Sequence, residues 1–216
     1  SSKIWVNSPV LNVEKTTDKP FYKYGDIITY RIVLTQEQTG CVARNVTLQD
    51  VIDTQGVRLL KDSVILMDEK GNVADADVQI NDDNTFLMST GRTLVRDSRY
   101  SICDNDKGGL FEQVMYNPLD CQEQKSMIVE YQAAVIDAAL AGQKVHNTAV
   151  ADSSEKIPAT GETETEVHSP ILEIVKESDK KEYASGEKGY YKLTVRQLRE
   201  DVTDQNIVIE DKLETQ

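Results

Sequence analysis

The chain has 216 residues, of which 39% are hydrophobic, and its formal net charge at pH 7 is -13. The hydrophobic fraction is large enough for a folded core and excludes wholesale disorder, whereas the acidity argues against a nucleic-acid-binding protein, which needs a dense basic surface. No stretch approaches the roughly 20 apolar residues of a membrane-spanning helix, so we expect no membrane insertion by these residues.

The predicted elements are short β-strands separated by turn residues. In chain order, β-branched or alternating segments predict strands over 27–34, 45–50, 64–68, 127–135 and 144–150. Residues 69–72 have the composition of a hairpin turn, and residues 137–142 are compatible with one helical turn. The longer, more polar segment 92–125 indicates an insertion or an elaborated loop. Short strands without a long helical period predict an all-β fold of the immunoglobulin-like β-sandwich type.

An internal repeat relates the two ends of the chain. Residues 6–15 align with residues 167–176, and the offset of 161 residues holds without a gap to the C-terminus. Identical pairs in this register are Asp18/Asp179, Lys19/Lys180, Tyr22/Tyr183, Gly25/Gly186, Tyr30/Tyr191, Gln36/Gln197, Asn45/Asn206 and Asp50/Asp211. We therefore predict tandem modules: one complete module over 9–168, the N-terminal part of a second, truncated module over 169–216, and the tail of a preceding module or a linker over 1–8.

Three polar residues of the complete module continue the apolar faces of predicted strands. Alternate residues of a strand point to the same side. The three sets that share a face are Leu11, Val13 and Lys15; Val46, Leu48 and Asp50; and Val145, Asn147 and Ala149. The second module repeats two of these sets, with Lys176 and Asp211 in the same places. A buried charge is costly unless it is paired, so this recurrence needs a physical reason.

Two interpretations of these residues remain open at this point. In the first, Lys15 and Asp50 form a buried salt bridge with a hydrogen bond to Asn147, or the three residues lie at strand ends that emerge into solvent. In the second they react. An apolar pocket lowers the pKa of a lysine and raises that of an aspartate, so a neutral amine could attack the asparagine carboxamide while the protonated aspartate polarises it and shuttles protons. The product would be an amide cross-link between the first and last strands of the module, formed with loss of ammonia.

Four segments of the complete module, taken together and in this order, are similar to a known family. Residues 11–15, 24–30, 45–50 and 145–149 resemble the repeat domains of Gram-positive cell-surface proteins, and the related pilin and adhesin domains that carry self-formed Lys–Asn isopeptide bonds. The resemblance covers most of 9–168 and begins again at Pro170. The segment 92–125 departs from the family pattern, in which a short connection is usual.

This resemblance implies roles for individual residues. Lys15 would be the nucleophile of an isopeptide bond, Asn147 its acceptor, and Asp50 the acid/base residue. In the second module Lys176 and Asp211 match the nucleophile and the acid/base residue, whereas the acceptor strand is absent. We expect no enzyme acting on an external substrate, because the cross-link would form once per molecule and within it.

The resemblance also implies a function for the whole chain. The implied function is that of a structural stalk or adhesin repeat of a bacterial cell-surface or pilus-like protein, extracellular and attached to the cell wall, with signal and anchor outside these residues. Its partners would be neighbouring modules of the same chain and a host surface protein or glycan. The alternative is a ligand-binding adhesin module that recognises a host protein or glycan through the segment 92–125.

The three cysteines are Cys41, Cys103 and Cys121, and this odd count leaves at least one thiol unpaired or available for an intermolecular bond. Cys103 and Cys121 flank a polar segment and are either joined in a disulfide or present as separate thiols. No Cys or His pair has the spacing of zinc ligands, so we expect no metal site and no cofactor. Residues 157–161 look like a sortase sorting signal, but an acidic segment follows them, and we expect a loop before the last strand.

Overall fold

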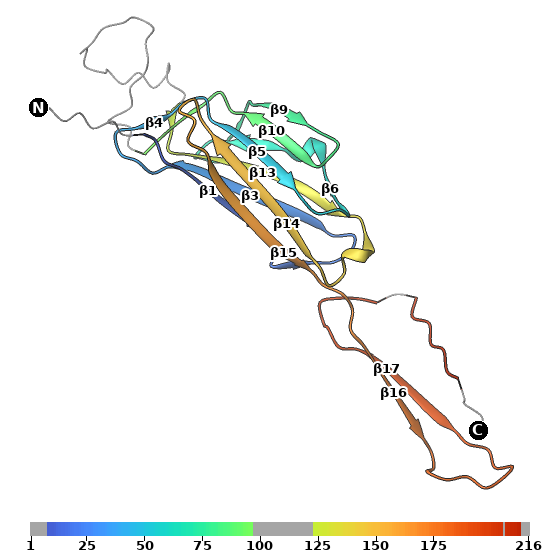
Figure 1. Cartoon of the computed structure of the whole chain (residues 1–216). Coiled ribbons are helices and arrows are strands. Elements are labelled where there is room, and N and C mark those ends of the chain that lie inside the picture. Colours follow the sequence, from blue (N-terminus) through green and yellow to red (C-terminus); the bar gives the residue numbers. More distant parts are fainter. Residues whose placement is uncertain (1–7, 97–122, 205, 213–216) are drawn as a thin grey trace, which may run out of the picture. The chain divides into compact units, whose positions relative to one another are not determined.

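The computed structural model describes residues 8–96, 123–204 and 206–212 (Figure 1). These residues divide into two units between Val167 and His168, which we call unit 1 (residues 8–96 and 123–167) and unit 2 (residues 168–204 and 206–212). Residues 1–7 of the expected tail over 1–8, most of the segment 92–125, and both Cys103 and Cys121 lie outside the described residues.

Two β-sheets form the sandwich of unit 1 (Figure 1). The first has the order β1 (Leu11–Thr17), β3 (Ile27–Gln36), β13 (Ser126–Val135), β7 (Ile65–Met67) and β8 (Val73–Ala74), with β6 (Val57–Leu59) also paired to β13. The second has the order β2 (Phe21–Tyr22), β15 (Ala159–Val167), β14 (Lys144–Asp152), β5 (Thr47–Ile52), β10 (Thr85–Ser89) and β9 (Asp77–Ile80). Within these two sheets the paired strands are antiparallel, except for β2 and β15. The prediction of an all-β, immunoglobulin-like sandwich is confirmed.

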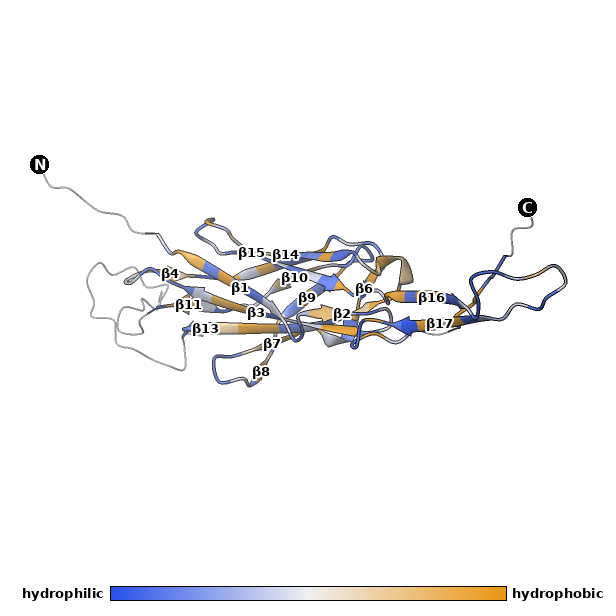
Figure 2. Ribbon diagram, turned by 90° about the horizontal axis from the view of Figure 1, so that it is seen from below, coloured by the Kyte–Doolittle hydropathy of each residue, from blue (hydrophilic) through white to orange (hydrophobic). Residues whose placement is uncertain are grey.

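The core of unit 1 lies between the sheets and follows from strand alternation. Along β1, buried and exposed side chains alternate from Leu11 to Lys15, and the same alternation runs along most of β3 and β14. Figure 2 shows the result as hydrophobic and hydrophilic segments interspersed along the strands. The largest side chains that are fully buried include Tyr22, Tyr30, Phe86 and Tyr131. An aromatic cluster therefore occupies the interior, where burial of such rings supplies much of the stabilising apolar area.

A small third sheet changes the interpretation of the segment 92–125. It contains β12 (Glu123–Gln124), β11 (Thr93–Val95) and β4 (Val42–Ala43), with β11 parallel to β12 and antiparallel to β4. The prediction of a loop is therefore wrong at both ends of this segment. Leu94 and Val95 of β11 are buried. Because the residues around them in the sequence are polar, this short strand was not recognised from the sequence.

Two further predictions concern short elements. The expected helical turn within 137–142 is confirmed as a 3₁₀ turn over Ala138–Leu140, and a second such turn spans Lys61–Ser63. The loop expected over 157–161 is wrong from Ala159 onward, because β15 begins there. A side chain at Gly161 would place its Cβ 2.6 Å from the backbone oxygen of Val13, so the absence of a side chain lets β15 approach β1.

Unit 2 contains one antiparallel hairpin among its described residues, made of β16 (Leu172–Ser178) and β17 (Tyr191–Gln197). Its register matches that of β1 and β3 at the offset of 161 residues: Lys176 lies opposite Leu193, as Lys15 lies opposite Ile32. In the part of the chain that the structure describes, no helix is both long and apolar enough to span a membrane.

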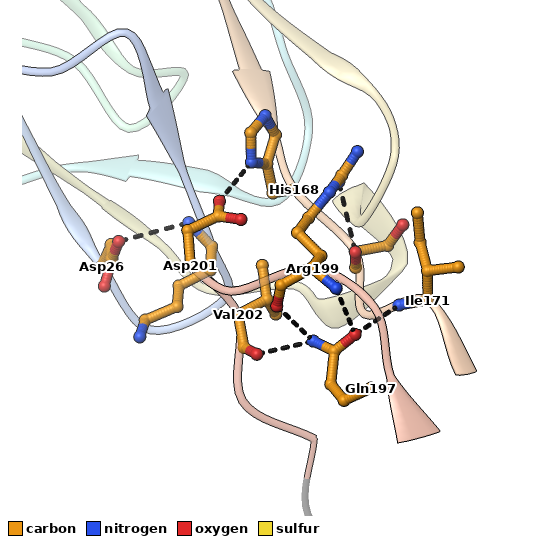
Figure 3. A network of polar contacts seen from close by, with 9 residues as sticks. Asp26, His168, Ile171, Gln197, Arg199, Asp201 and Val202 are labelled. Carbon is orange, nitrogen blue, oxygen red and sulfur yellow. Dashed lines mark hydrogen bonds and ion pairs between the residues drawn. The ribbon is translucent and has the colours of Figure 1, made fainter. Parts of the chain in front are cut away.

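The hydrogen bonds at the end of this hairpin also repeat those of unit 1. The side-chain amide of Gln197 donates to the carbonyl oxygens of Arg199 and Val202, at 2.9 and 2.6 Å (Figure 3). Gln36 is the counterpart of Gln197 in unit 1. It donates to the carbonyl oxygens of the two residues that correspond to Arg199 and Val202 at the offset of 161 residues. The equivalent glutamines thus fix the same turn in unit 1 and in unit 2.

Candidate functional site

The three residues singled out in the sequence meet in the core of unit 1. β1 supplies Lys15, β5 supplies Asp50 and β14 supplies Asn147. The Lys15 Nζ atom forms an ion pair with Asp50 Oδ2, and neither side chain is accessible to solvent. The same Nζ atom donates to Asn147 Oδ1 at 2.7 Å. β1 belongs to the first sheet and the other two strands to the second, so the cluster bridges the sandwich.

A fourth residue, Tyr131 of β13, contacts all three. Its hydroxyl donates to Asp50 Oδ1 at 2.6 Å and accepts from Asn147 Nδ2 at 2.6 Å. Lys15 Nζ lies 3.0 Å from the same oxygen and donates to it. Every polar group of the cluster is therefore hydrogen-bonded within it, as buried polar groups require.

Sequence reasoning did not single out Tyr131, although it placed this residue on a predicted strand. Alternation along 127–135 puts Tyr131 on the same face as Val129 and Ala133, and this face is buried. The signal that could have found it is a phenol hydroxyl on an inward face, because a buried tyrosine needs a polar partner. In this core, that partner is the cluster itself.

Aromatic rings enclose the cluster and keep it away from water. Tyr30 stacks on Tyr131 with ring centroids 5.0 Å apart, and Phe86 meets Tyr131 edge-on at the same separation. Lys15 Nζ lies 5.4 and 5.5 Å from the ring centroids of Tyr30 and Tyr131. These ring faces stabilise a cationic amine without providing a base for its proton.

The environment shifts the pKa values of the paired groups toward their uncharged forms. Burial lowers the pKa of Lys15 to about 8, although the charge of Asp50 opposes this shift. Burial raises the pKa of Asp50, against the opposing effects of Lys15 and of hydrogen bonds from its neighbours. Burial, and then the nearby Asp50 charge, raise the pKa of Tyr131 well above its usual range. Transfer of a proton from Lys15 to Asp50 therefore costs less here than in water.

This arrangement can support an amide-forming reaction. An amine is held by hydrogen bonding against a carboxamide, and a carboxyl group contacts the amine on its other side. Confinement of amine and carboxamide in a rigid, dry core provides the high effective concentration that a slow reaction needs. The same contacts also describe a buried salt bridge with a hydrogen bond to Asn147.

The equivalent pair in unit 2 has a different environment. Lys176 Nζ lies 2.7 and 2.9 Å from the two carboxylate oxygens of Asp211, but about a third of each side chain is exposed (34% and 36%). Ile174 and Ile207, which correspond to the buried residues Val13 and Val46 of unit 1, are also exposed. Lys176 and Asp211 thus form an ion pair, but the described residues of unit 2 do not bury it in a dry core.

Some expectations about the site need correction or lie outside the described residues. Asn147 lies on β14, the next-to-last strand of unit 1, because β15 follows it as the last; a bond from Lys15 would therefore not join the first and last strands. Among the described residues Cys41 is a free thiol. Cys103 and Cys121, expected either as a disulfide or as separate thiols, lie outside the described residues. Among the residues that the structure describes, no group of three or more His, Cys, Asp or Glu side chains is placed to hold a metal ion.

Comparisons with known proteins concern the fold alone. No protein-family model and no curated protein sequence matches this chain. Similar solved structures include a backbone pilin of Streptococcus pyogenes (14% identity, TM-score 0.44), the major pilin subunit BcpA of Bacillus cereus (11%, 0.47) and the N-terminal domain of an adhesin of Streptococcus gordonii (14%, 0.47). These three structural neighbours are pilins and an adhesin domain of Gram-positive bacteria. The matches cover 76%, 76% and 74% of this chain but only 36%, 41% and 32% of those proteins.

Proposed function

We propose that this chain is part of a structural stalk or adhesin on a Gram-positive cell surface, and that an isopeptide bond between Lys15 and Asn147 stabilises unit 1. The observation that carries the proposal is the hydrogen bond from Lys15 Nζ to the Asn147 carboxamide, made beside Asp50 in a core closed to water. A load-bearing extracellular protein benefits from a covalent tie that reduction does not break. The acidic surface fits this role, because repulsion between like-charged copies keeps such a protein soluble.

The proposed reaction begins with proton transfer from the Lys15 ammonium to the Asp50 carboxylate. The neutral amine then attacks Cγ of Asn147, so that an Nζ–Cγ bond forms while the Cγ–Nδ2 bond breaks. The carboxamide nitrogen leaves as ammonia, and Asp50 ends the reaction protonated. Atoms and charge balance: one ammonium, one carboxylate and one primary amide become one secondary amide, one carboxylic acid and one ammonia.

The bond would link the two sheets of the sandwich. β1 is the edge strand of the first sheet, and β14 lies inside the second sheet between β15 and β5. A cross-link between them closes the chain from Lys15 to Asn147, which includes most of unit 1. Like a disulfide, it would limit the freedom of the unfolded chain, but thiols would not cleave it.

Unit 2 fits the proposal as the beginning of a second module of the same kind. It repeats the register, the glutamine turn and the Lys–Asp pair of unit 1. A two-stranded hairpin is only marginally stable by itself in water. We infer that further strands, equivalent to β13 and β14 of unit 1, would cover the open side of unit 2 in an array of such modules, and that neighbouring modules are partners of this chain.

The test is the intact mass of the reduced protein, compared with that of an Asn147→Ala variant. We expect the wild type to be lighter than its sequence mass by one ammonia, about 17 Da, and the variant to match its sequence mass. Peptide mapping should then find Lys15 joined to Asn147. An unshifted wild-type mass would remove the cross-link and leave an ordinary β-sandwich with a buried salt bridge.

A further inference from the structure

The departure of ammonia requires a proton at Asn147 Nδ2, and the hydrogen bond from this nitrogen goes to the Tyr131 hydroxyl. The carboxamide nitrogen cannot leave as an amide anion, so it must gain a proton before the Cγ–Nδ2 bond breaks. The attacking nitrogen must lose a proton in the same reaction. Asp50 Oδ2 contacts the attacking nitrogen, whereas the hydrogen bond from Asn147 Nδ2 goes to the Tyr131 hydroxyl. The proton is therefore released at one end of the cluster and required at the other.

We propose that Tyr131 is a catalytic residue of the cross-linking reaction, and that its hydroxyl passes a proton from Asp50 to the departing nitrogen of Asn147. This inference rests on the function proposed above. The contacts form a continuous path: Lys15 Nζ to Asp50 Oδ2, Asp50 Oδ1 to the Tyr131 hydroxyl at 2.6 Å, and the hydroxyl to Asn147 Nδ2 at 2.6 Å. Both 2.6 Å distances lie at or below the short end of the usual range for hydrogen bonds, so each proton has a short path.

The hydrogen bonds that join Tyr131 to Asn147 and to Asp50 must both reverse during the reaction. The Asp50 carboxylate accepts from the phenol, whereas protonated Asp50 donates to it. In the planar carboxamide the Nδ2 lone pair is delocalised, so Nδ2 donates and the tyrosine oxygen accepts. Attack on Cγ makes this nitrogen pyramidal and restores its lone pair, which can then accept the phenol proton. Tyr131 recovers from Asp50 Oδ1 the proton that Asp50 gained from the Lys15 ammonium. Asp50 then takes a second proton from the attacking nitrogen at Oδ2, so it ends the reaction protonated. The phenol ends as it began, so no proton is gained or lost along the relay.

Tyr22 provides a matched control because its hydroxyl contacts none of the reacting groups. Both Tyr22 and Tyr131 are fully buried in the core of unit 1. The Tyr22 hydroxyl donates to Asp18 Oδ1 at 2.6 Å, whereas the Tyr131 hydroxyl contacts three reacting groups. Replacement of either tyrosine by phenylalanine removes one hydrogen-bonded phenol oxygen from the core. Only the change at residue 131 interrupts the proposed relay.

The experiment follows cross-linking in time. The full chain is made by a short pulse of cell-free synthesis, samples are quenched in acidic denaturant, and intact mass reports the fraction that has lost ammonia. We expect Tyr131→Phe to react about 10²-fold or more slowly than wild type, which is the usual contribution of a positioned acid–base group. Tyr22→Phe should stay within about threefold of wild type, because the Tyr22 hydroxyl takes part in no proton transfer.

Each result is informative. Equal rates for Tyr131→Phe and wild type would overturn the relay while the isopeptide bond stands, and equal slowing by both tyrosine variants would assign the effect to packing. A wild type without a mass deficit would remove both proposals. Should Tyr131→Phe not fold, the wild-type rate in H₂O/D₂O mixtures decides. If several protons move together along the path, a plot of the cross-linking rate against the deuterium fraction is curved. A straight line would contradict the relay.

Discussion

Lys15 and Asp50 occupy positions where apolar side chains would serve stability as well or better. The attraction between two buried charges is largely offset by the cost of removing them from water, and replacing such pairs by packed apolar residues is often neutral or stabilising by about 1–4 kcal/mol. Both side chains are fully buried. Stability alone therefore gives a weak reason for this pair, whereas an amine and an acid that react with Asn147 give a specific one.

The shared proton of this pair leads to a prediction for the pH dependence of cross-linking. The reactive state holds one proton between Lys15 and Asp50, with the amine neutral and the acid protonated. This proton is lost as the pH rises through the Lys15 pKa of about 8. A second proton is gained as the pH falls through the raised pKa of Asp50. The rate should therefore rise through the Asp50 pKa, reach a plateau, and fall above about pH 8.

The measurement is the rate of ammonia loss at a series of pH values, by the same timed mass assay. A rate that keeps rising above pH 8 would mean that only the neutral amine matters, and that Asp50 does not act as a proton carrier. Asp50→Asn is the matched variant, because it keeps the size of the side chain and removes its titration. We expect its reaction to be too slow to follow.

At the scale of strands, the proposed bond should govern the stability of unit 1. A cross-link from β1 to β14 closes a loop of more than 100 residues, for which the chain-entropy relation gives a stabilisation of about 5 kcal/mol. The Asn147→Ala variant should lose this amount of unfolding free energy, and somewhat more because Tyr131 and Lys15 each lose a hydrogen-bond partner. Denaturant unfolding of both proteins measures the difference.

Two controls separate the cross-link from other effects. His146→Ala changes the exposed neighbour on the same strand and should alter stability by less than about 0.5 kcal/mol. A reducing agent should leave the wild-type unfolding curve unchanged, because an amide is not reduced by thiols. Similar curves for wild type and Asn147→Ala would argue against a covalent tie between the sheets.

Strand patterns made much of the fold and the site predictable. Alternation placed Lys15, Asp50 and Asn147 on faces that the structure buries, because side-chain direction in a strand is a local property. The partner of an inward residue is not local: Lys15 meets Tyr131 across 116 residues of sequence, through strand order that periodicity does not encode. The two-residue strand β12 was missed because it is too short to show alternation.

At the scale of the whole molecule, the two units differ in how much apolar surface they hide. The core of unit 1 contains the fully buried residues Ile32 and Leu48, whereas their counterparts in unit 2, Leu193 and Ile209, are exposed at 37% and 47%. The sequence repeat therefore does not produce equal burial within these 216 residues. A hairpin with open apolar faces should unfold locally far more often than a closed sandwich does.

Limited proteolysis should resolve this difference. Because a protease cuts segments that open, we expect cleavage within unit 2 to be at least about tenfold faster than cleavage within the described parts of unit 1. The resistant product should end near Val167 and retain the ammonia deficit, measured by intact mass. In Asn147→Ala, unit 1 should become more sensitive while unit 2 is cut as before. Equal resistance of both units would mean that a partner, such as another copy of the chain, covers the apolar face of unit 2.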